Sequence, residues 1–297
     1  MSNAVNRLPA RALIEALGRS TGQEVLQGSQ KLLAPLHGQE PYEGVRISRD
    51  MTYGPDERHR LDVYAPSQGA SGRPILMFVH GGGFLRGDKK TPGLPFFENI
   101  GVWAVRNGMV GVNITYRRLP QHRHPAGIED VAAAIAWVKA RIAGYGGDGE
   151  RILLYGSSAG AALIASYVAS PSVHASDGHD GKGPGIAGLI VSSGYYDFAA
   201  MGGHETIAPY FGAGAERFSS LHGVVASGVP VVVTVGEFEQ QKYQEQALLL
   251  ATALFKRNAE LPKFIVHAGH NHYTSVMGMG LDSNDPVLAA IKLLAGV

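Results

Sequence analysis

The chain has 297 residues, 45% of them hydrophobic and 17% charged, so it can bury the core of one large α/β domain or of two small ones. Its formal net charge of +1, with lysines and arginines scattered along the sequence, offers no basic block for binding nucleic acid. Because cysteine is absent, disulfides, thiolate metal sites and a cysteine nucleophile are excluded.

The N-terminal residues show no basic region followed by an apolar stretch, so we expect no signal peptide and, on that ground, a cytoplasmic location. The sequence has no window of about 18 apolar residues, so a membrane span is not expected either. We therefore expect neither nucleic acid nor a membrane as a partner.

Residues 9–36 are predicted to form two short helices, because apolar residues recur there every three to four positions, with interruptions at Gly18 and Gly22. Residues 44–48 and 60–64 alternate polar and apolar side chains, as half-buried antiparallel strands do. A turn is expected between these strands, at residues 53–56.

Continuous apolar runs follow, and such runs are typical of strands buried on both faces of a parallel sheet: residues 75–79, 109–114, 152–155, 186–191, 229–235 and 264–266. Stretches with helical character separate or follow them: residues 96–107, 128–142, 158–169, 241–258 and 286–294. This alternation predicts an α/β fold with a mostly parallel, doubly wound sheet in a single domain over residues 1–297. In such sheets, sites form at the carboxyl ends of the strands.

Residues 156–160 read Gly-Ser-Ser-Ala-Gly and lie between an apolar run and a helical run of small residues. This is the strand–turn–helix setting in which a G-x-S-x-G motif forms a nucleophile elbow, with Ser158 as the nucleophile. Glycines are needed two positions before and after the serine, because bulky side chains there would collide in the strained turn. The alternative is an ordinary turn in which Ser157 or Ser158 caps the helix.

His80 and three glycines follow directly after the apolar run at residues 75–79. Glycines at the end of a strand allow backbone N–H groups to point into a site without side chains in the way. We expect the amides of Gly82 and Gly83, together with that of Ala159 after the nucleophile, to form an oxyanion hole. A plain glycine turn is the alternative.

With these two motifs the chain resembles the α/β-hydrolase fold and, within it, the hormone-sensitive-lipase-like carboxylesterases. The resemblance spans about residues 60–275 and is carried by residues 80–84, 116–120, 125–130 and 156–160 and by later acid and histidine segments. Ser157 stands where the family commonly has aspartate, and the N-terminal region is short for a large lid. Both features are closer to feruloyl- or acetyl-esterase-like and aryl-formamidase-like members. The resemblance implies a small helical cap, for which residues 1–40 and 198–226 are the candidates.

The family's catalytic acid follows a strand in a Gly-x-x-Asp pattern. Here Gly236 ends the apolar run, and the pattern aligns the acid with Glu239. Glutamate is an accepted acid in such triads. Glu237 is the rival, although its side chain could tie down the loop instead, and Asp197 is a third candidate.

Three histidines follow the last apolar run: His267, His270 and His272. The family's Gly-x-x-His-aromatic pattern selects His272 as the catalytic base, with His270 as the alternative and His267 as a hydrogen-bonded residue at the strand end. His-x-His could chelate a metal, but no further ligand is nearby, so we expect no metal and no cofactor. The resemblance also implies that His80 braces the oxyanion loop.

The implied activity is hydrolysis of small to medium esters with short acyl or aryl groups, through a Ser158–His272–Glu239 triad and an acyl-enzyme. Aromatic and apolar residues near the predicted strand ends could contact such a substrate; the candidates are Phe84, Leu85, Tyr195 and Tyr196.

Other functions fit the same motifs. An amidase or aryl-formamidase would use the same triad, as would a thioesterase or a lactonase. A catalytically inactive hydrolase fold that acts as a small-molecule receptor is the alternative from another class. The last strand also offers a pairing edge for a homodimer.

Overall fold

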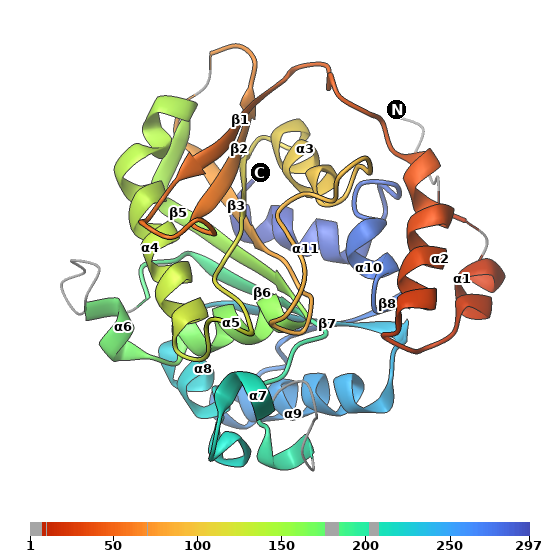
Figure 1. Ribbon diagram of the computed structural model, residues 1–297, viewed down its shortest axis with the longest axis vertical. Coiled ribbons are helices and arrows are strands. Elements are labelled where there is room, and N and C mark those ends of the chain that lie inside the picture. Colours follow the sequence, from red (N-terminus) through yellow and green to blue (C-terminus); the bar gives the residue numbers. More distant parts are fainter. Residues whose placement is uncertain (1–7, 10, 70, 176–183, 202–207) are drawn as a thin grey trace.

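The computed structural model describes residues 8–9, 11–69, 71–175, 184–201 and 208–297 of the chain. In these residues an eight-stranded sheet forms the centre of the molecule, in the order β1-β2-β4-β3-β5-β6-β7-β8 (Figure 1). β1 and β2 are antiparallel to their neighbours, and the six strands from β3 onward are parallel to one another. The strands are β1 (Val45–Thr52), β2 (Arg60–Pro66), β3 (Arg73–Val79), β4 (Val110–Ile114), β5 (Gly147–Ser157), β6 (Gly188–Ser192), β7 (Val231–Phe238) and β8 (Lys263–Asn271).

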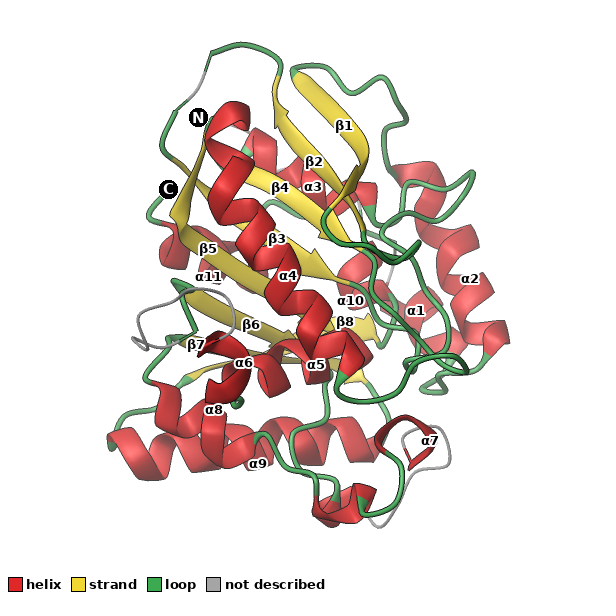
Figure 2. Cartoon of the chain, turned by 60° about the vertical axis from the view of Figure 1, so that its left-hand side comes forward, coloured by secondary structure: helices red, strands yellow, loops and turns green. Residues whose placement is uncertain are grey.

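Helices cover both faces of the sheet, which confirms the doubly wound α/β architecture (Figure 2). One core contains side chains of α4 (Ala126–Arg141), α5 (Ala159–Val168), α8 (Leu221–Ser227) and α9 (Gln241–Asn258). The core on the other face contains side chains of α3 (Glu98–Arg106), α10 (Thr274–Met277) and α11 (Pro286–Ala295). Short elements complete the chain: α6 (Pro171–Ala175), α7 (Ala208–Phe211) and the 3₁₀ turns η1 (Ala34–Leu36), η2 (Ile142–Tyr145), η3 (Ala199–Met201) and η4 (Ala215–Arg217).

Two strands differ in burial from what their sequence patterns indicate. β2 was expected to be half-buried, but its five inner residues are all buried, because the strand lies between β1 and β4 and beneath α3. β8 was expected to be buried on both faces. It forms one edge of the sheet, and Val266 near its centre is 51% exposed. Burial therefore follows the position of a strand in the sheet as well as its composition.

The N-terminal segment forms the two short helices that its periodicity predicts, α1 (Arg11–Leu17) and α2 (Gln23–Leu33). Gly18 ends the first helix with φ 86°, and Gly22 is the N-cap of the second. α1 packs against β8 and α2 packs against α10, so both helices lie beside the end of the last strand (Figure 1). In the second expected cap segment, residues 198–226, residues 202–207 lie outside the described residues. No helix in the described ranges is both long and apolar enough to cross a bilayer.

The contact between α3 and the sheet requires two glycines. A β-carbon on Gly111 in β4 would lie 2.6 Å from the α-carbon of Gly101 in α3. One on Gly101 would collide with the ring of Tyr64 in β2. Because the obstacle for Gly111 is backbone rather than a flexible side chain, the helix would have to move away from the sheet to admit even one methyl group.

We predict that Gly111→Ala lowers the free energy of unfolding by about 1–3 kcal/mol, because it overpacks this helix–sheet contact. Urea unfolding followed by circular dichroism measures the change. The control is Gly38→Ala, since Gly38 is exposed and a β-carbon there meets no atom within 4 Å. Equal stability of the Gly111 variant and the parent would contradict the tight packing of α3.

Candidate active site

The turn between β5 and α5 holds Ser158 in a strained backbone conformation, with φ 54° and ψ −120°. Glycine is required on both sides of it. A β-carbon on Gly156 would lie 2.6 Å from the carbonyl oxygen of Gly160, and one on Gly160 would collide with the carbonyl oxygen of Val79 at the end of β3. Ser158 occupies the N-cap position of α5, but its hydroxyl makes no capping hydrogen bond. The turn is therefore a sharp strand-to-helix elbow with Ser158 at its tip.

The glycine loop after β3 lies directly against this elbow. A β-carbon on Gly81 would lie 3.1 Å from the β-carbon of Ser158. Gly82 and Gly83 both have positive φ, 122° and 62°, and the carbonyl of Gly82 accepts the N–H of Arg86, which closes the loop on itself. The N–H groups of Gly82 and Gly83 have no acceptor among the described residues. Both are therefore available to an oxygen that develops negative charge near Ser158.

An acid–base pair stands at the ends of the last two strands. Nδ1 of His272, just after β8, lies 3.0 Å from Oε2 of Glu239, just after β7. Their side chains are 6% and 0% exposed, so the pair is shielded from bulk water. This burial strengthens the interaction between imidazole and carboxylate and fixes the orientation of the ring.

The two rival acids have other partners. The Glu237 carboxylate accepts the N–H of Gly269 at 2.8 Å and pairs with the exposed guanidinium of Arg11. The hydrogen bond from Arg11 holds the pKa of Glu237 below its usual range. The Asp197 carboxylate accepts the N–H of Ala200, at the start of a 3₁₀ turn. Of the three candidates, only Glu239 contacts His272 among the described residues.

The other two histidines of this segment form a separate buried pair. Nε2 of His267 lies 3.1 Å from Oδ2 of Asp285, and the rings of His267 and His270 are 3.9 Å apart. Burial, together with the neighbouring His267, lowers the pKa of His270 to about 3, so its ring is neutral near pH 7. His267 is thus a hydrogen-bonded residue, but it lies in the middle of β8 and not at the strand end. Among the described residues, no carboxylate is hydrogen-bonded to His270 as Glu239 is to His272.

His80 is completely buried beneath the glycine loop. Its Nδ1 lies 2.6 Å from the carbonyl oxygen of Gly81, and its ring stacks on Tyr116 with centroids 4.4 Å apart. The Tyr116 hydroxyl donates to the His80 carbonyl at 2.9 Å. Burial lowers the pKa of His80 to about 4, so the ring is neutral and supports the loop by packing and hydrogen bonding.

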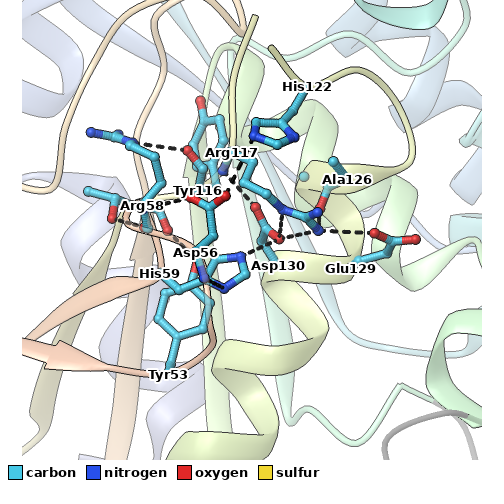
Figure 3. A network of polar contacts seen from close by, with 12 residues as sticks. Tyr53, Asp56, Arg58, His59, Tyr116, Arg117, His122, Ala126, Glu129 and Asp130 are labelled. Atoms are coloured by element: carbon cyan, nitrogen blue, oxygen red, sulfur yellow. Dashed lines mark hydrogen bonds and ion pairs between the residues drawn. The ribbon is translucent and has the colours of Figure 1, made fainter.

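A polar network around Asp130 anchors the segment that carries Tyr116 (Figure 3). Asp130 is buried in α4. Its carboxylate accepts two hydrogen bonds from Arg117, one from the backbone N–H at 2.6 Å and one from the guanidinium Nε at 2.8 Å. Nε2 of His59 lies 2.9 Å from the same carboxylate. Arg58, the residue before His59, donates to the Tyr116 carbonyl at 3.3 Å. Asp130 therefore anchors a neighbouring loop from within the helix, whose N-cap is Pro125.

The residues expected to contact substrate differ in exposure. Leu85 is 47% exposed, next to the glycine loop. Phe84 is fully buried and stacks on Tyr210 with centroids 4.1 Å apart. Tyr196 is fully buried in the main core. Two cavities of about 320 Å³ each lie elsewhere, and neither is lined by these residues or by Ser158 and His272.

Two residues that the sequence patterns did not single out contact the acid–base pair. The Ser193 hydroxyl donates a hydrogen bond to Oε1 of Glu239. The ring of Tyr243 lies 4.5 Å from the ring of His272, and its hydroxyl accepts that of Tyr195 at 2.6 Å. Ser193 directly follows β6, so the only signal for it was the general rule that site residues gather at the carboxyl ends of strands.

The joint between α1 and α2 also touches the site. The guanidinium of Arg19 donates to the carbonyl of Glu239 at 3.2 Å. The Tyr273 hydroxyl, next to His272 in the chain, donates to the carbonyl of Thr21 at 2.6 Å. These contacts fasten the N-terminal helices to the two loops that hold Glu239 and His272.

The sheet order, the helices on both faces, and a serine at a strained elbow at the same end of the sheet as a buried histidine–glutamate pair define an α/β hydrolase. Solved structures share this fold. They include esterase B of Lactobacillus rhamnosis (TM-score 0.69, 18% identity, 86% of each chain covered) and a thermostable esterase of Pseudomonas putida (TM-score 0.66, 18% identity, 99% of this chain and 97% of the other).

The chain belongs to the BD-FAE family, whose model matches residues 61–209, half of the chain. This confirms the resemblance to hydrolases of the carboxylesterase type. Relatives include a probable isoprenylcysteine alpha-carbonyl methylesterase of Arabidopsis thaliana, 27% identical over 77% of this chain and 44% of that protein. Esterase LipQ of Mycobacterium tuberculosis is 34% identical over 54% of this chain and 38% of that protein. The chain thus spans less than half the length of these two relatives.

The buried His270 predicts a specific dependence of stability on pH. Its folded pKa lies near 3, well below the ordinary value of 6.5, so the unfolded chain binds more protons between these values and stability is lost as the pH falls through this window. We predict that the parent loses roughly 2 kcal/mol more free energy of unfolding than His270→Gln between pH 7 and 4.5. Urea unfolding at both pH values measures this. Equal losses in the two proteins would contradict the assignment of a neutral, buried ring.

Proposed function

We propose that this protein is a serine carboxylic-ester hydrolase that acts on small to medium esters with short acyl or aryl groups. The observation that carries the proposal is the buried His272–Glu239 pair, 3.0 Å between Nδ1 and Oε2, at the same end of the sheet as the strained Ser158 and the glycine loop. The names of the relatives, methylesterases and carboxylesterases among them, support an ester substrate.

The proposed reaction proceeds in two acyl transfers. His272 takes the proton of Ser158 as the serine oxygen attacks the ester carbonyl, and Glu239 stabilises the imidazolium that forms. His272 then gives that proton to the departing alcohol, which leaves an acyl-enzyme. Water, deprotonated by the same histidine, attacks the acyl-enzyme, and His272 returns that proton to the serine oxygen as the acid is released.

The oxyanion of each tetrahedral intermediate would accept hydrogen bonds from the glycine loop and from the elbow. The available N–H groups of Gly82 and Gly83 and the amide of Ala159, the first residue of α5, are the proposed donors. They are held in place before the substrate arrives, because His80 and Tyr116 support the loop from beneath. Donors fixed in advance stabilise developing charge without reorganisation during the reaction.

The preference for small substrates is supported by what lies around the site. The α1–α2 joint is hydrogen-bonded to the loops of the acid and the base, which restricts the space beside His272. Phe84, which could have formed an apolar wall, is fully buried against Tyr210 and leaves Leu85 as the exposed apolar residue of that loop. A short acyl chain needs no more apolar surface than this.

We predict that initial rates on p-nitrophenyl acetate and butyrate exceed those on octanoate and palmitate, and that Ser158→Ala reduces the acetate rate by a factor of at least about 10³. Absorbance of released p-nitrophenol measures both. Covalent labelling by an organophosphonate should occur in the parent and be absent in the variant.

A preference for palmitate would contradict the small-substrate proposal. Turnover of N-formylated aryl amines with none of the esters would favour the formamidase reaction instead. Absence of both labelling and turnover in the parent would favour the receptor function.

A second prediction separates the two neighbouring glutamates. Glu239→Gln should lower kcat by roughly 10³–10⁴-fold, because an amide cannot stabilise the imidazolium and favours the wrong tautomer of His272. Glu237→Gln should change kcat less than about threefold, since its amide oxygen can still accept the N–H of Gly269. Steady-state kinetics on p-nitrophenyl acetate compare the pair. A larger loss at Glu237 would identify it as the acid.

A further inference from the structure

The carboxylate of Glu239 has a second partner besides His272. Oε2 accepts a hydrogen bond from Nδ1 of His272, whereas Oε1 accepts one from the hydroxyl of Ser193. Ser193 and Glu239 are both 0% exposed, so water does not compete for either oxygen. Hydrogen bonds to both oxygens hold a buried carboxylate in one orientation. Here one oxygen is bound by the residue after β8 and the other by the residue after β6.

Ser193 is itself held in an unusual conformation. Its φ is 52°, a region that residues with a side chain rarely adopt, and its N–H donates to the carbonyl of Thr234 in β7 at 2.9 Å. The preceding residue, Ser192, accepts the backbone N–H of Ser158 at 2.8 Å. The Ser192–Ser193 pair at the end of β6 therefore binds the nucleophile elbow on one side and the acid on the other (Figure 2 shows β6 between β5 and β7).

We propose that Ser193 is a positioning residue for the catalytic acid, acting through its hydroxyl on Glu239 and thereby on the basicity and orientation of His272. This rests on the proposed hydrolase function. The hydroxyl fixes the plane of the carboxylate so that Oε2 faces the imidazole, and it disperses part of the buried negative charge. The strained backbone at Ser193 is the conformation that directs the hydroxyl to Oε1.

Removing this donor has a consequence that loss of packing does not share. With one hydrogen bond fewer, the carboxylate holds more charge on Oε2 and stabilises the imidazolium more strongly. His272 then keeps its proton to a higher pH, so the acid limb of the rate profile moves to higher pH. Other charged or titratable groups face Glu239 and stay constant across the variants: Arg19, Tyr195, Tyr196, Lys242, Tyr243 and Tyr273.

The test compares Ser193→Ala and Ser193→Gly with the parent, using kcat and KM on p-nitrophenyl acetate from pH 5 to 9. Both variants lack the hydroxyl, but glycine adopts the positive φ without strain. We expect kcat to fall about tenfold in both, with KM within twofold, and the acid limb to move up by roughly half to one pH unit. Ser227→Ala is the matched control, because that hydroxyl donates to a backbone carbonyl, that of Val224, and not to Glu239, and it lies at the C-terminal end of α8.

A parent-like pH profile in both variants would overturn the proposal, even if activity falls. Parent-like activity in the glycine variant would show that only the backbone conformation matters and would also overturn it. If alanine prevents folding, the glycine variant alone decides between these results.

A readout that does not need turnover separates this proposal from the proposed function. We expect the proton between Nδ1 of His272 and Glu239 to give a low-field NMR signal whose shift changes in Ser193→Gly but not in Ser227→Ala. If the parent neither turns over esters nor labels with an organophosphonate, the proposed function fails, while this signal still tests the link between Ser193, Glu239 and His272. If the signal of Ser193→Gly equals that of the parent, the proposed link between Ser193, Glu239 and His272 is overturned, whether or not the parent is active.

Discussion

The close approach of two backbones at the carboxyl ends of β3 and β5 is the constraint on which the rest of the site depends. Gly160 at the start of α5 touches the last residues of β3 with no room for a β-carbon, and Gly81 lies against the side chain of Ser158. This approach brings the loop after β3 and the first turn of α5 together, and these two segments carry the amides that we propose as oxyanion donors. The strain at Ser158 persists because the packed strand ends on both sides leave the turn no relaxed alternative.

Burial of one carboxylate is the second determinant, and the two glutamates after β7 show why. Glu237 is partly exposed and its carboxylate pairs with an exposed guanidinium, so solvent screens its charge. Glu239, two residues on, has no exposed surface, and both of its oxygens are hydrogen-bonded. In a site of low dielectric a fixed negative charge acts strongly on its neighbour, which is what an imidazole needs in order to act as a base.

The fold and most of the candidate site could be predicted from the sequence because they depend on local patterns. The apolar runs and glycine motifs require particular backbone conformations wherever they occur, as Gly18 and the elbow at Ser158 illustrate. The burial of β2 and the exposure of Val266 could not be predicted, because both depend on the order of strands in the sheet. Ser193 carries no local signature, since its partner is 46 residues away and reaches it only because β6 and β7 are neighbours.

A bulge at the end of β8 explains why His272, rather than a histidine within the strand, meets the acid. Between β7 and β8 the register advances by two residues on β7, from Gly236 to Phe238, but by four on β8. The extra length includes Gly269, whose φ of 75° turns the chain and whose N–H is held by Glu237. A regular strand would have carried the chain straight past the end of β7. Glu237 therefore contributes to the site by binding the backbone of this bulge, and the bulge brings Glu239 and His272 together.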